Sequence, residues 1–207
     1  MNETEKRMNL DNNYFILESA VTDRFCDHVL EYGKHLKEQT ATTWGVDLNN
    51  MTPDQINKFE KLRKSKITWM NDNWIYKEIK PIIHQVNEQA GWNFQWSETE
   101  PFQFTKYEGT EKQHYDWHTD SGTKSQTTDG LIRKISASLI LVDNNEYEGG
   151  NFEIFSPHPE ESKVLSISLK QKGTMIFFPS FVYHRVKPVT SGTRYSLVCW
   201  NKGYLFK

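Results

Sequence analysis

The segment Tyr115–Asp120, which reads YDWHTD, contains a histidine and an aspartate at a spacing suited to shared chemistry. Successive side chains of a β-strand leave opposite faces, so His118 and Asp120 would leave the same face and point together. A third group, His184, lies in a second strand-like run. Two imidazoles and one carboxylate can form a facial ligand set that holds a divalent metal and leaves coordination positions open. Arg194, ten residues after His184, could form the planar, two-pronged clamp that binds a carboxylate.

Two other side chains on the same face of this strand compete for the metal. His114 would lie about 13 Å from His118 at about 3.3 Å per residue, which is too far for one ion held by bonds of about 2 Å. Asp116 is nearer, and we interpret it either as a neighbour that supports a ligand or as a solvated carboxylate. Tyr115 and Trp117 would face away from the metal in a regular strand, although a bulge would turn Tyr115 inward.

The C-terminal half of the chain carries a series of short motifs. They are His118-x-Asp120, Arg133-Lys134-Ile135-Ser136, Tyr147-Glu148-Gly149-Gly150, Phe178-Pro179-Ser180, Tyr183-His184-Arg185-Val186 and Gly192-Thr193-Arg194-Tyr195-Ser196-Leu197. In their order and spacing these motifs resemble the 2-oxoglutarate- and iron(II)-dependent dioxygenases, and within them the prolyl 4-hydroxylase-like branch. The resemblance covers roughly Phe102 to Gly203, and the N-terminal half carries no comparable signature.

The resemblance implies a role for each residue of the candidate site. His118, Asp120 and His184 would bind iron(II), and Arg194 would hold the far carboxylate of 2-oxoglutarate. Ser196, two residues after Arg194 and on the same face, would add a hydrogen bond. The implied reaction couples the oxidative decarboxylation of 2-oxoglutarate by O2, which gives succinate and carbon dioxide, to hydroxylation of a substrate C–H bond. Ascorbate is expected as a reductant.

Two aromatic residues are expected beside the cosubstrate. The resembling family often places a tyrosine hydroxyl on the strand before His-x-Asp, and Tyr107 fits that position, although core packing explains this residue as well. Trp200 shares the parity of Arg194 and would wall the pocket. The chain departs from the animal oxygen-sensing prolyl hydroxylases at Ser136–Ile140, which reads SASLI where those enzymes have a tyrosine. The contacts to the cosubstrate therefore need not be identical.

Length and composition restrict the class of protein. A chain of 207 residues suits one domain with a continuous core. The 25 Lys and Arg residues against 27 Asp and Glu give a net charge of -2, so no global field favours nucleic acid or an anionic membrane. Cys26 and Cys199 provide no disulfide framework, and no apolar run suits a signal peptide or a membrane span. We therefore expect a cytoplasmic protein, whose oligomeric state the sequence leaves undefined.

Residues 1–91 are expected to form a mainly helical support region. Helices are predicted from Thr22 to about Glu38, from Thr52 to about Arg63 and from Trp74 to Ala90. The second would open with a capping box and a proline, and the third would be kinked by Pro81 and closed by Gly91. Lys66–Met70 is expected to be a strand.

Residues 92–207 read as short strands separated by turn residues, which is typical of a jelly roll. The expected strands are Trp92–Trp96, Pro101–Tyr107, Ile135–Val142, Gly150–Phe155, Val164–Leu169, Thr174–Phe178, Val182–Val186 and Thr193–Trp200. We therefore predict a mainly β fold, a double-stranded β-helix (jelly roll) core with the N-terminal helices packed on one sheet, in a single catalytic domain of residues 1–207. The polar segment Ser121–Gly130 would be a loop at the mouth of the site and is a candidate lid.

Several readings of this site remain open at this stage. The favoured substrate is a prolyl residue of a peptide or protein, and the alternatives are a free amino acid, another protein side chain or, least favoured, a nucleobase. The fold alone decides no function, so a non-catalytic jelly-roll binding module is another possibility. Such a module would not need three metal ligands together with Arg194. A zinc hydrolase could use the same three ligands but would not need Arg194.

Overall fold

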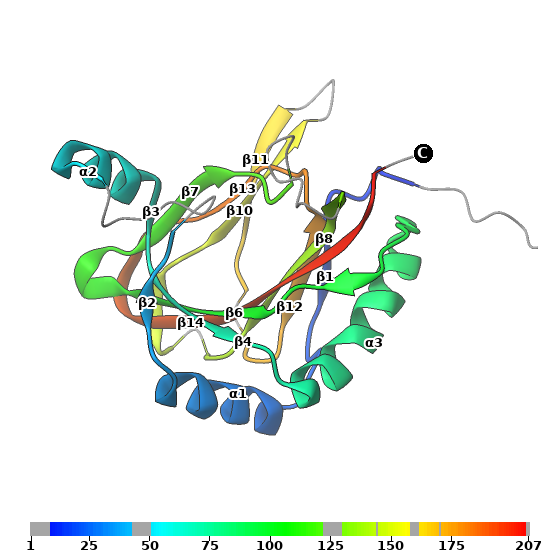
Figure 1. Cartoon of the computed structure of the whole chain (residues 1–207), viewed down its shortest axis with the longest axis horizontal. Coiled ribbons are helices and arrows are strands. Elements are labelled where there is room, and N and C mark those ends of the chain that lie inside the picture. The colour runs from blue at the N-terminus through cyan, green and yellow to red at the C-terminus, as the bar shows by residue number, and fades with distance from the viewer. Residues whose placement is uncertain are drawn as a thin grey trace, which may run out of the picture.

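Two antiparallel β-sheets face each other in the part of the chain that the structure describes (Figure 1). The structure is a computed structural model, and it describes residues 9–42, 51–121, 130–143, 145–157, 162–169 and 171–205. The large sheet runs in the order β1 (Phe15–Leu17), β12 (Met175–Pro179), β8 (Leu131–Ile140), β14 (Val189–Tyr204), β6 (Phe102–Glu108), β4 (Lys66–Met70) and β2 (Gln39–Thr40). Two further strands, β5 (Glu98–Thr99) and β9 (Tyr147–Gly149), also pair with β14.

The small sheet closes the other side of the roll. It runs in the order β11 (Ser162–Ile167), β10 (Phe152–Pro157), β13 (His184–Val186), β7 (His114–His118) and β3 (Arg63–Lys64). Two facing sheets of antiparallel strands form a double-stranded β-helix, or jelly roll. The predicted mainly β, jelly-roll fold class is confirmed.

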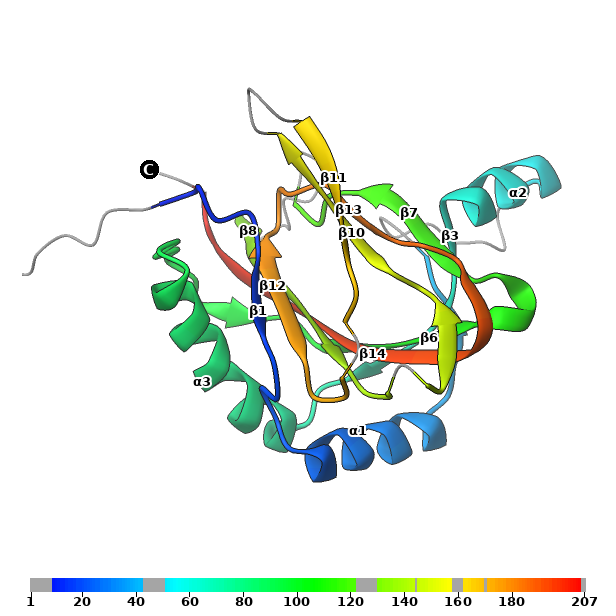
Figure 2. The same ribbon diagram turned by 180° about the vertical axis from the view of Figure 1, so that it is seen from behind.

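The helices come from the N-terminal part of the chain. They are α1 (Asp23–His35), α2 (Pro53–Leu62) and α3 (Asn73–Gln89), and a short 3-10 helix, η2 (Gly109–Glu111), lies before β7. In the view from behind, α1 and α3 lie along the outer face of the large sheet, whereas α2 stands apart beside β3 and β7 (Figure 2). Within the described ranges, no helix is both long enough and apolar enough to cross a membrane.

The helix starts follow the predicted capping chemistry. The hydroxyl of Thr22 accepts a hydrogen bond from the Phe25 N–H and begins α1. The capping box of α2 is present, since Thr52 and Gln55 bond each other's backbone N–H groups. The end of α1 at His35 comes three residues before the predicted end, because Leu36 adopts extended backbone angles.

The side chains of the central strand β14 alternate between the two faces of the large sheet. Leu197 and Cys199 belong to the apolar core that the sheet shares with α1 and α3. Arg194, Ser196 and Trp200, which alternate with them, line a cavity between the two sheets. The neighbouring strands β6 and β8 pair with β14 in register, so their side chains alternate in the same way. The sheet therefore presents an apolar face to the helices and a face that carries both polar and apolar side chains to the interior of the roll.

The prediction of a strand at Trp92–Trp96 is wrong. These residues form no strand, and Asn93 has a positive φ of 49°. Both backbone polar groups of Phe94 are bonded by the Asn87 side chain, and the Trp92 indole donates to the Asn12 carbonyl. Aromatic residues read as strand formers, but here Trp92 and Phe94 fill the core between helix and sheet.

Three N-terminal segments add strands that the sequence did not indicate. β1 pairs with β12 at one edge of the large sheet, and β2 pairs with β4 at the other. In the small sheet, β3 pairs with β7. Each is only two or three residues long, too short to show an alternating pattern. The predicted loop Ser121–Gly130 falls largely on residues 122–129, which lie outside the described residues.

The close approach of α1 to the sheet depends on Gly33. A Cβ at this position would lie 2.7 Å from the Phe104 ring and 2.8 Å from the Met70 methyl group. Alanine gains about 1 kcal/mol of helix propensity over glycine, but overpacking a core costs about 1 to 3 kcal/mol. We therefore expect Gly33→Ala to lower the free energy of unfolding by about 1 kcal/mol in urea denaturation. Lys34→Ala, at the exposed neighbouring position, should change it by less than about 0.5 kcal/mol. A stabilised Gly33→Ala protein would show that the helix does not need this contact.

Candidate metal centre

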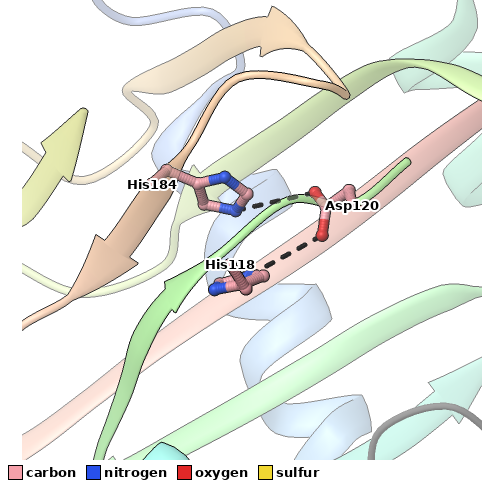
Figure 3. Close-up of side chains that lie close together, drawn as sticks. All are labelled: His118, Asp120 and His184. Carbon is pink, nitrogen blue, oxygen red and sulfur yellow. Dashed lines mark ion pairs between the residues drawn. The ribbon is translucent and has the colours of Figure 1, made fainter. Parts of the chain in front are cut away.

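Three side chains, two from strands of the small sheet and one from just beyond β7, meet at one point (Figure 3). The Nε2 atom of His118 lies 3.7 Å from one oxygen of Asp120, and that of His184 lies 3.6 Å from the other. The possible ligand atoms of the three residues all lie within 4.8 Å of one another. A metal with bonds of about 2.1 Å separates its ligand atoms by about 3 to 4 Å. The three groups are therefore close enough to bind one ion after a small contraction.

The strand pairing positions these three groups. His118 at the end of β7 lies directly opposite His184 on β13. Asp120 lies two residues beyond the end of β7, where its N–H donates to the Ser180 carbonyl over 2.9 Å. Ser180 follows β12, so Asp120 is held by backbone contacts on a neighbouring turn. The predicted His-x-Asp arrangement thus brings both side chains together, although Asp120 itself is outside the strand.

Backbone carbonyls fix the orientation of both imidazoles. Nδ1 of His118 is 2.8 Å from the Asp116 carbonyl oxygen, and Nδ1 of His184 is 2.9 Å from that of Val182. A carbonyl only accepts hydrogen bonds, so each Nδ1 carries the proton and donates. Each Nε2 is then left with a free lone pair on the side of Asp120. This is the arrangement by which proteins orient histidines toward a metal.

The protonation states of His118 and Asp120 suit the binding of a metal cation. Burial, together with the neighbouring His184, lowers the pKa of His118 to about 3. Burial raises the pKa of Asp120, but the two histidines, Arg133 and a hydrogen bond from Ser136 together bring it well below its usual value. At neutral pH the imidazole of His118 is neutral and Asp120 is ionised. Metal binding would therefore need to displace no proton from either group.

A bulge in β7 turns Tyr115 toward the metal centre. His184 pairs with His118 but Val186 pairs with Tyr115, so β7 carries one more residue than β13 between these pairs. Tyr115 consequently lines the cavity, and its ring stacks on that of His118 with centroids 3.4 Å apart. The prediction that Tyr115 faces away in a regular strand is wrong, and the bulged alternative describes the strand. Arg63 covers the Tyr115 ring, 4.4 Å from its centroid.

The rival residues on β7 lie away from the three ligands. Both ring nitrogens of His114 lie 3.0 Å from backbone carbonyls, those of Lys112 and Lys61. The side chain of Asp116 forms an ion pair with Arg185 over 3.3 Å. Asp116 therefore contacts the site only through its carbonyl, which orients His118.

Arg194 is a fully buried charged residue inside the roll. Its side chain is 1% exposed and lines the same cavity as the three ligands. Nη1 donates to the Ser196 hydroxyl over 3.2 Å, and Nε has no hydrogen-bond partner. Among the described residues, no carboxylate forms an ion pair with it. A buried guanidinium without an anion is costly, so this observation fits a site that receives a carboxylate from outside the chain.

The two predicted aromatic residues border this cavity. Tyr107 pairs with Arg194 in the sheet, and the guanidinium lies 5.6 Å from the centroid of its ring. Burial raises the pKa of Tyr107, so its hydroxyl remains a donor at neutral pH. Trp200 also lines the cavity, and its buried indole N–H has no hydrogen-bond partner. Arg133 lies 4.0 Å from the Trp200 ring centroid.

Sequence reasoning missed the apolar residues around His184. The rings of Phe178 and Phe152 lie 4.4 Å and 5.5 Å from its imidazole, and both line the cavity. Gln103 and Ser138 line it from the large sheet. A signal was available, because Gln103 shares parity with Tyr107 on one strand, and a polar residue at an inward position indicates a lined cavity. Phe152 and Phe178 carry no such signal, since aromatic residues on strands are usually core.

The C-terminal half of the chain matches a known family. Residues 102–202 match the model of the 2OG-Fe(II) oxygenase superfamily. A curated relative, a PKHD-type hydroxylase of Shewanella oneidensis, is 36% identical over 98 residues, which are 47% of this chain and 40% of the relative. The chain thus spans about two fifths of the length of the curated relatives that it matches.

Solved structures share the fold over nearly the whole chain. A prolyl-4-hydroxylase of Pseudomonas putida has a TM-score of 0.65 at 16% identity and is covered over 93% of both chains. A prolyl hydroxylase of Trichoplax adhaerens, in complex with a peptide fragment of the hypoxia inducible factor oxygen degradation domain, has a TM-score of 0.65 at 20% identity. That match covers 92% of this chain and 84% of the other. At these identities the likeness shows a common fold.

Proposed function

We propose that the protein is an iron(II)- and 2-oxoglutarate-dependent dioxygenase of the prolyl hydroxylase-like type, because residues 102–202 match the model of the 2OG-Fe(II) oxygenase superfamily. It couples decarboxylation of 2-oxoglutarate to hydroxylation of a substrate C–H bond. The observation that carries the proposal is the pairing of two features in one cavity. His118, Asp120 and His184 offer three metal ligands, and the buried Arg194 offers a cation without an anion.

The donor set fits iron(II) together with a 2-oxo acid. Three protein ligands would leave positions open on iron(II) for a 2-oxo acid and for O2. A zinc hydrolase would use the same ligands but has no need for Arg194 at the other end of the cavity. When bound, iron supplies the oxidative chemistry, with 2-oxoglutarate and O2 as cosubstrates.

The residues of the chain would bind, orient and exclude water. Arg194 would hold the far carboxylate of 2-oxoglutarate, supported by Ser196 and by the hydroxyl of Tyr107. Trp200 would form one wall of the pocket. Phe152 and Phe178 would keep the surroundings of His184 apolar, which strengthens charge interactions inside the site. These roles derive from geometry and from the family resemblance.

The substrate class is proposed to be a prolyl residue of a peptide or protein. The structural neighbour from Trichoplax adhaerens is described with a bound peptide, and Tyr115 and Trp200 give this cavity aromatic walls. Both features also allow a free amino acid or another protein side chain as the substrate, and these are the alternatives. The use of ascorbate and the cytoplasmic location stay predictions.

A substrate screen tests this proposal. We expect the protein with iron(II), 2-oxoglutarate and O2 to add one oxygen atom to a proline-containing peptide and to form one succinate per product. Mass spectrometry of peptide and free amino acid sets would measure both products. Oxygen addition to free amino acids alone would keep the oxygenase and overturn the peptide substrate. Oxygen addition that continues without 2-oxoglutarate would overturn the proposed reaction.

A further inference from the structure

The edge strand of the small sheet brings a residue of the N-terminal half to the metal centre. Helix α2 passes directly into β3, and the first residue of β3, Arg63, pairs with Tyr115 on β7 (Figure 2). The backbone N–H of Arg63 donates to the Phe59 carbonyl and ends the helix. Arg63 lies outside residues 102–202, which match the oxygenase superfamily. The pairing therefore places a side chain from outside that match opposite a residue that contacts the ligand His118.

Three planar groups are stacked in series at this point. The rings of Tyr115 and His118 are nearly parallel, with 11° between their planes and 3.4 Å between their centroids. The guanidinium carbon of Arg63 lies over the Tyr115 ring, 4.4 Å from its centroid. An imidazole centred this close fills its face of the phenol ring, so the guanidinium must lie on the opposite face. The order of the stack is therefore Arg63, Tyr115, His118.

The outer end of the stack is anchored by Arg63. Its side chain is 5% exposed, Nε donates to the Ser65 hydroxyl over 3.2 Å, and Nη1 donates to the Thr42 carbonyl over 3.4 Å. In the part of the chain that the structure describes, no carboxylate forms an ion pair with this guanidinium. A cation is attracted to the face of an aromatic ring more strongly when it is desolvated than at an exposed site. The buried charge of Arg63 therefore holds the Tyr115 ring in place.

The hydrogen bond of His118 does not by itself fix the tilt of its ring. Nδ1 donates to the Asp116 carbonyl over 2.8 Å, which fixes the position of that nitrogen but not of the ring plane. A change of tilt would move Nε2 relative to Asp120. The ring of His184 is tilted by 54° against that of His118 and so provides no parallel surface. The parallel ring of Tyr115 is therefore the contact that opposes the change of tilt.

We propose that Arg63 and Tyr115 are positioning residues of the metal centre. Arg63 holds the Tyr115 ring against His118, and the stack keeps Nε2 of His118 directed at the metal position. Neither residue binds the ion itself. Residues 1–91 thereby contribute a side chain to the organisation of the site, in addition to the helices that support the sheet. The inference rests on the proposed function, because the ion concerned is the one that the three ligands would bind.

Two substitutions interrupt the stack at different points. Arg63→Met removes the cation but keeps a long side chain, and Tyr115→Leu removes the ring. Arg63→Lys and Tyr115→Phe are the conservative variants, since the first keeps the charge and the second keeps the ring. Lys64→Met is the matched control, because Lys64 is the next residue of β3 and pairs with His114, whose ring nitrogens lie against backbone carbonyls.

The experiment measures cobalt(II) affinity by calorimetry and records the absorption spectrum of the bound cobalt, which reports the geometry of its ligands. Thermal melting shows which variants fold. Arg63→Met and Tyr115→Leu should weaken cobalt binding about tenfold or more and change the spectrum, whereas Tyr115→Phe and Lys64→Met should match wild type. Arg63→Lys should lie between wild type and Arg63→Met, because lysine carries the charge without the planar group. It is compared with wild type in place of Arg63→Met if that variant does not fold.

Unchanged cobalt affinity and spectrum in the folded Arg63 and Tyr115→Leu variants, even with lower melting temperatures, would overturn the positioning roles and leave the dioxygenase proposal intact. An equal loss of affinity in Lys64→Met would also overturn them, because any change in β3 would then disturb the site. The expected losses together with no conversion of 2-oxoglutarate by the iron-loaded wild type would support the stack and contradict the proposed function. A wild type that binds no cobalt would contradict both.

Discussion

Replacing Arg194 by alanine is expected to raise the 2-oxoglutarate concentration needed for half-saturation by a factor on the order of hundreds to thousands. The far carboxylate would enter a cavity in which Arg194 is the only described cation that lines it. Deleting one partner of a buried charge pair costs roughly 3 to 5 kcal/mol, and about 1.4 kcal/mol corresponds to a tenfold change. Iron binding should change little, because all three ligands remain.

A lysine at the same position separates charge from geometry. Arg194→Lys should recover part of the lost affinity, since it restores the charge but not the two-pronged clamp. Lys106→Ala is the matched control, because Lys106 lies on β6 opposite Tyr195, does not line the cavity and forms ion pairs with Glu38 and Glu108. The measurement is 2-oxoglutarate affinity with an inert metal bound. Equal affinity in all of these proteins would show that Arg194 is not the anchor.

His118→Ala is expected to weaken iron(II) or manganese(II) binding by on the order of a hundredfold or more, because even the loss of a residue that merely supports a ligand costs roughly 10- to 100-fold. Only two of the three protein ligands would then remain to hold the ion. The structure offers a control on the same strand in His114, whose ring nitrogens already lie against two backbone carbonyls. His114→Ala should bind the metal as tightly as wild type. A comparable loss in both variants would mean that the metal lies elsewhere.

Parts of the site could be predicted where they depend on the alternation of side chains along a strand. The pairing of Arg194 with Ser196 and the convergence of His118 with Asp120 both follow from side chains two residues apart. His184 comes from a distant strand, and only the family resemblance selected it among the other histidines. The backbone contacts that orient each imidazole could not be read from residue types, because carbonyl oxygens are present at every position.

Local irregularities of the backbone limited the prediction of the other features of the site and the fold. The orientation of Tyr115 depends on one extra residue in β7, and no glycine in HYDWH announces a bulge there. The strand expected at Trp92–Trp96 failed for a related reason. Its aromatic residues have high strand propensity, but tertiary packing and the Asn87 side chain determine the backbone. Propensity describes a half-buried pleated surface, and these residues instead fill a gap between helix and sheet.

The short strands β1, β2 and β3 mark a further limit of sequence analysis. They extend the two sheets only because long strands elsewhere present open edges to them. Nothing local distinguishes Gln39 and Thr40 from a loop. Residues 1–91 therefore contribute both the helices that were expected and edge strands that were not.

Release of carbon dioxide from 2-oxoglutarate labelled at its first carboxylate tests the central proposal most directly. The wild-type protein with iron(II) and O2 should release the label slowly even without a substrate and form an equal amount of succinate. Release should stop when iron or O2 is withheld and in His118→Ala, and should continue in His114→Ala. Equal release by wild type and His118→Ala, or none by wild type under any of these conditions, would contradict the assignment of this cavity as a dioxygenase site.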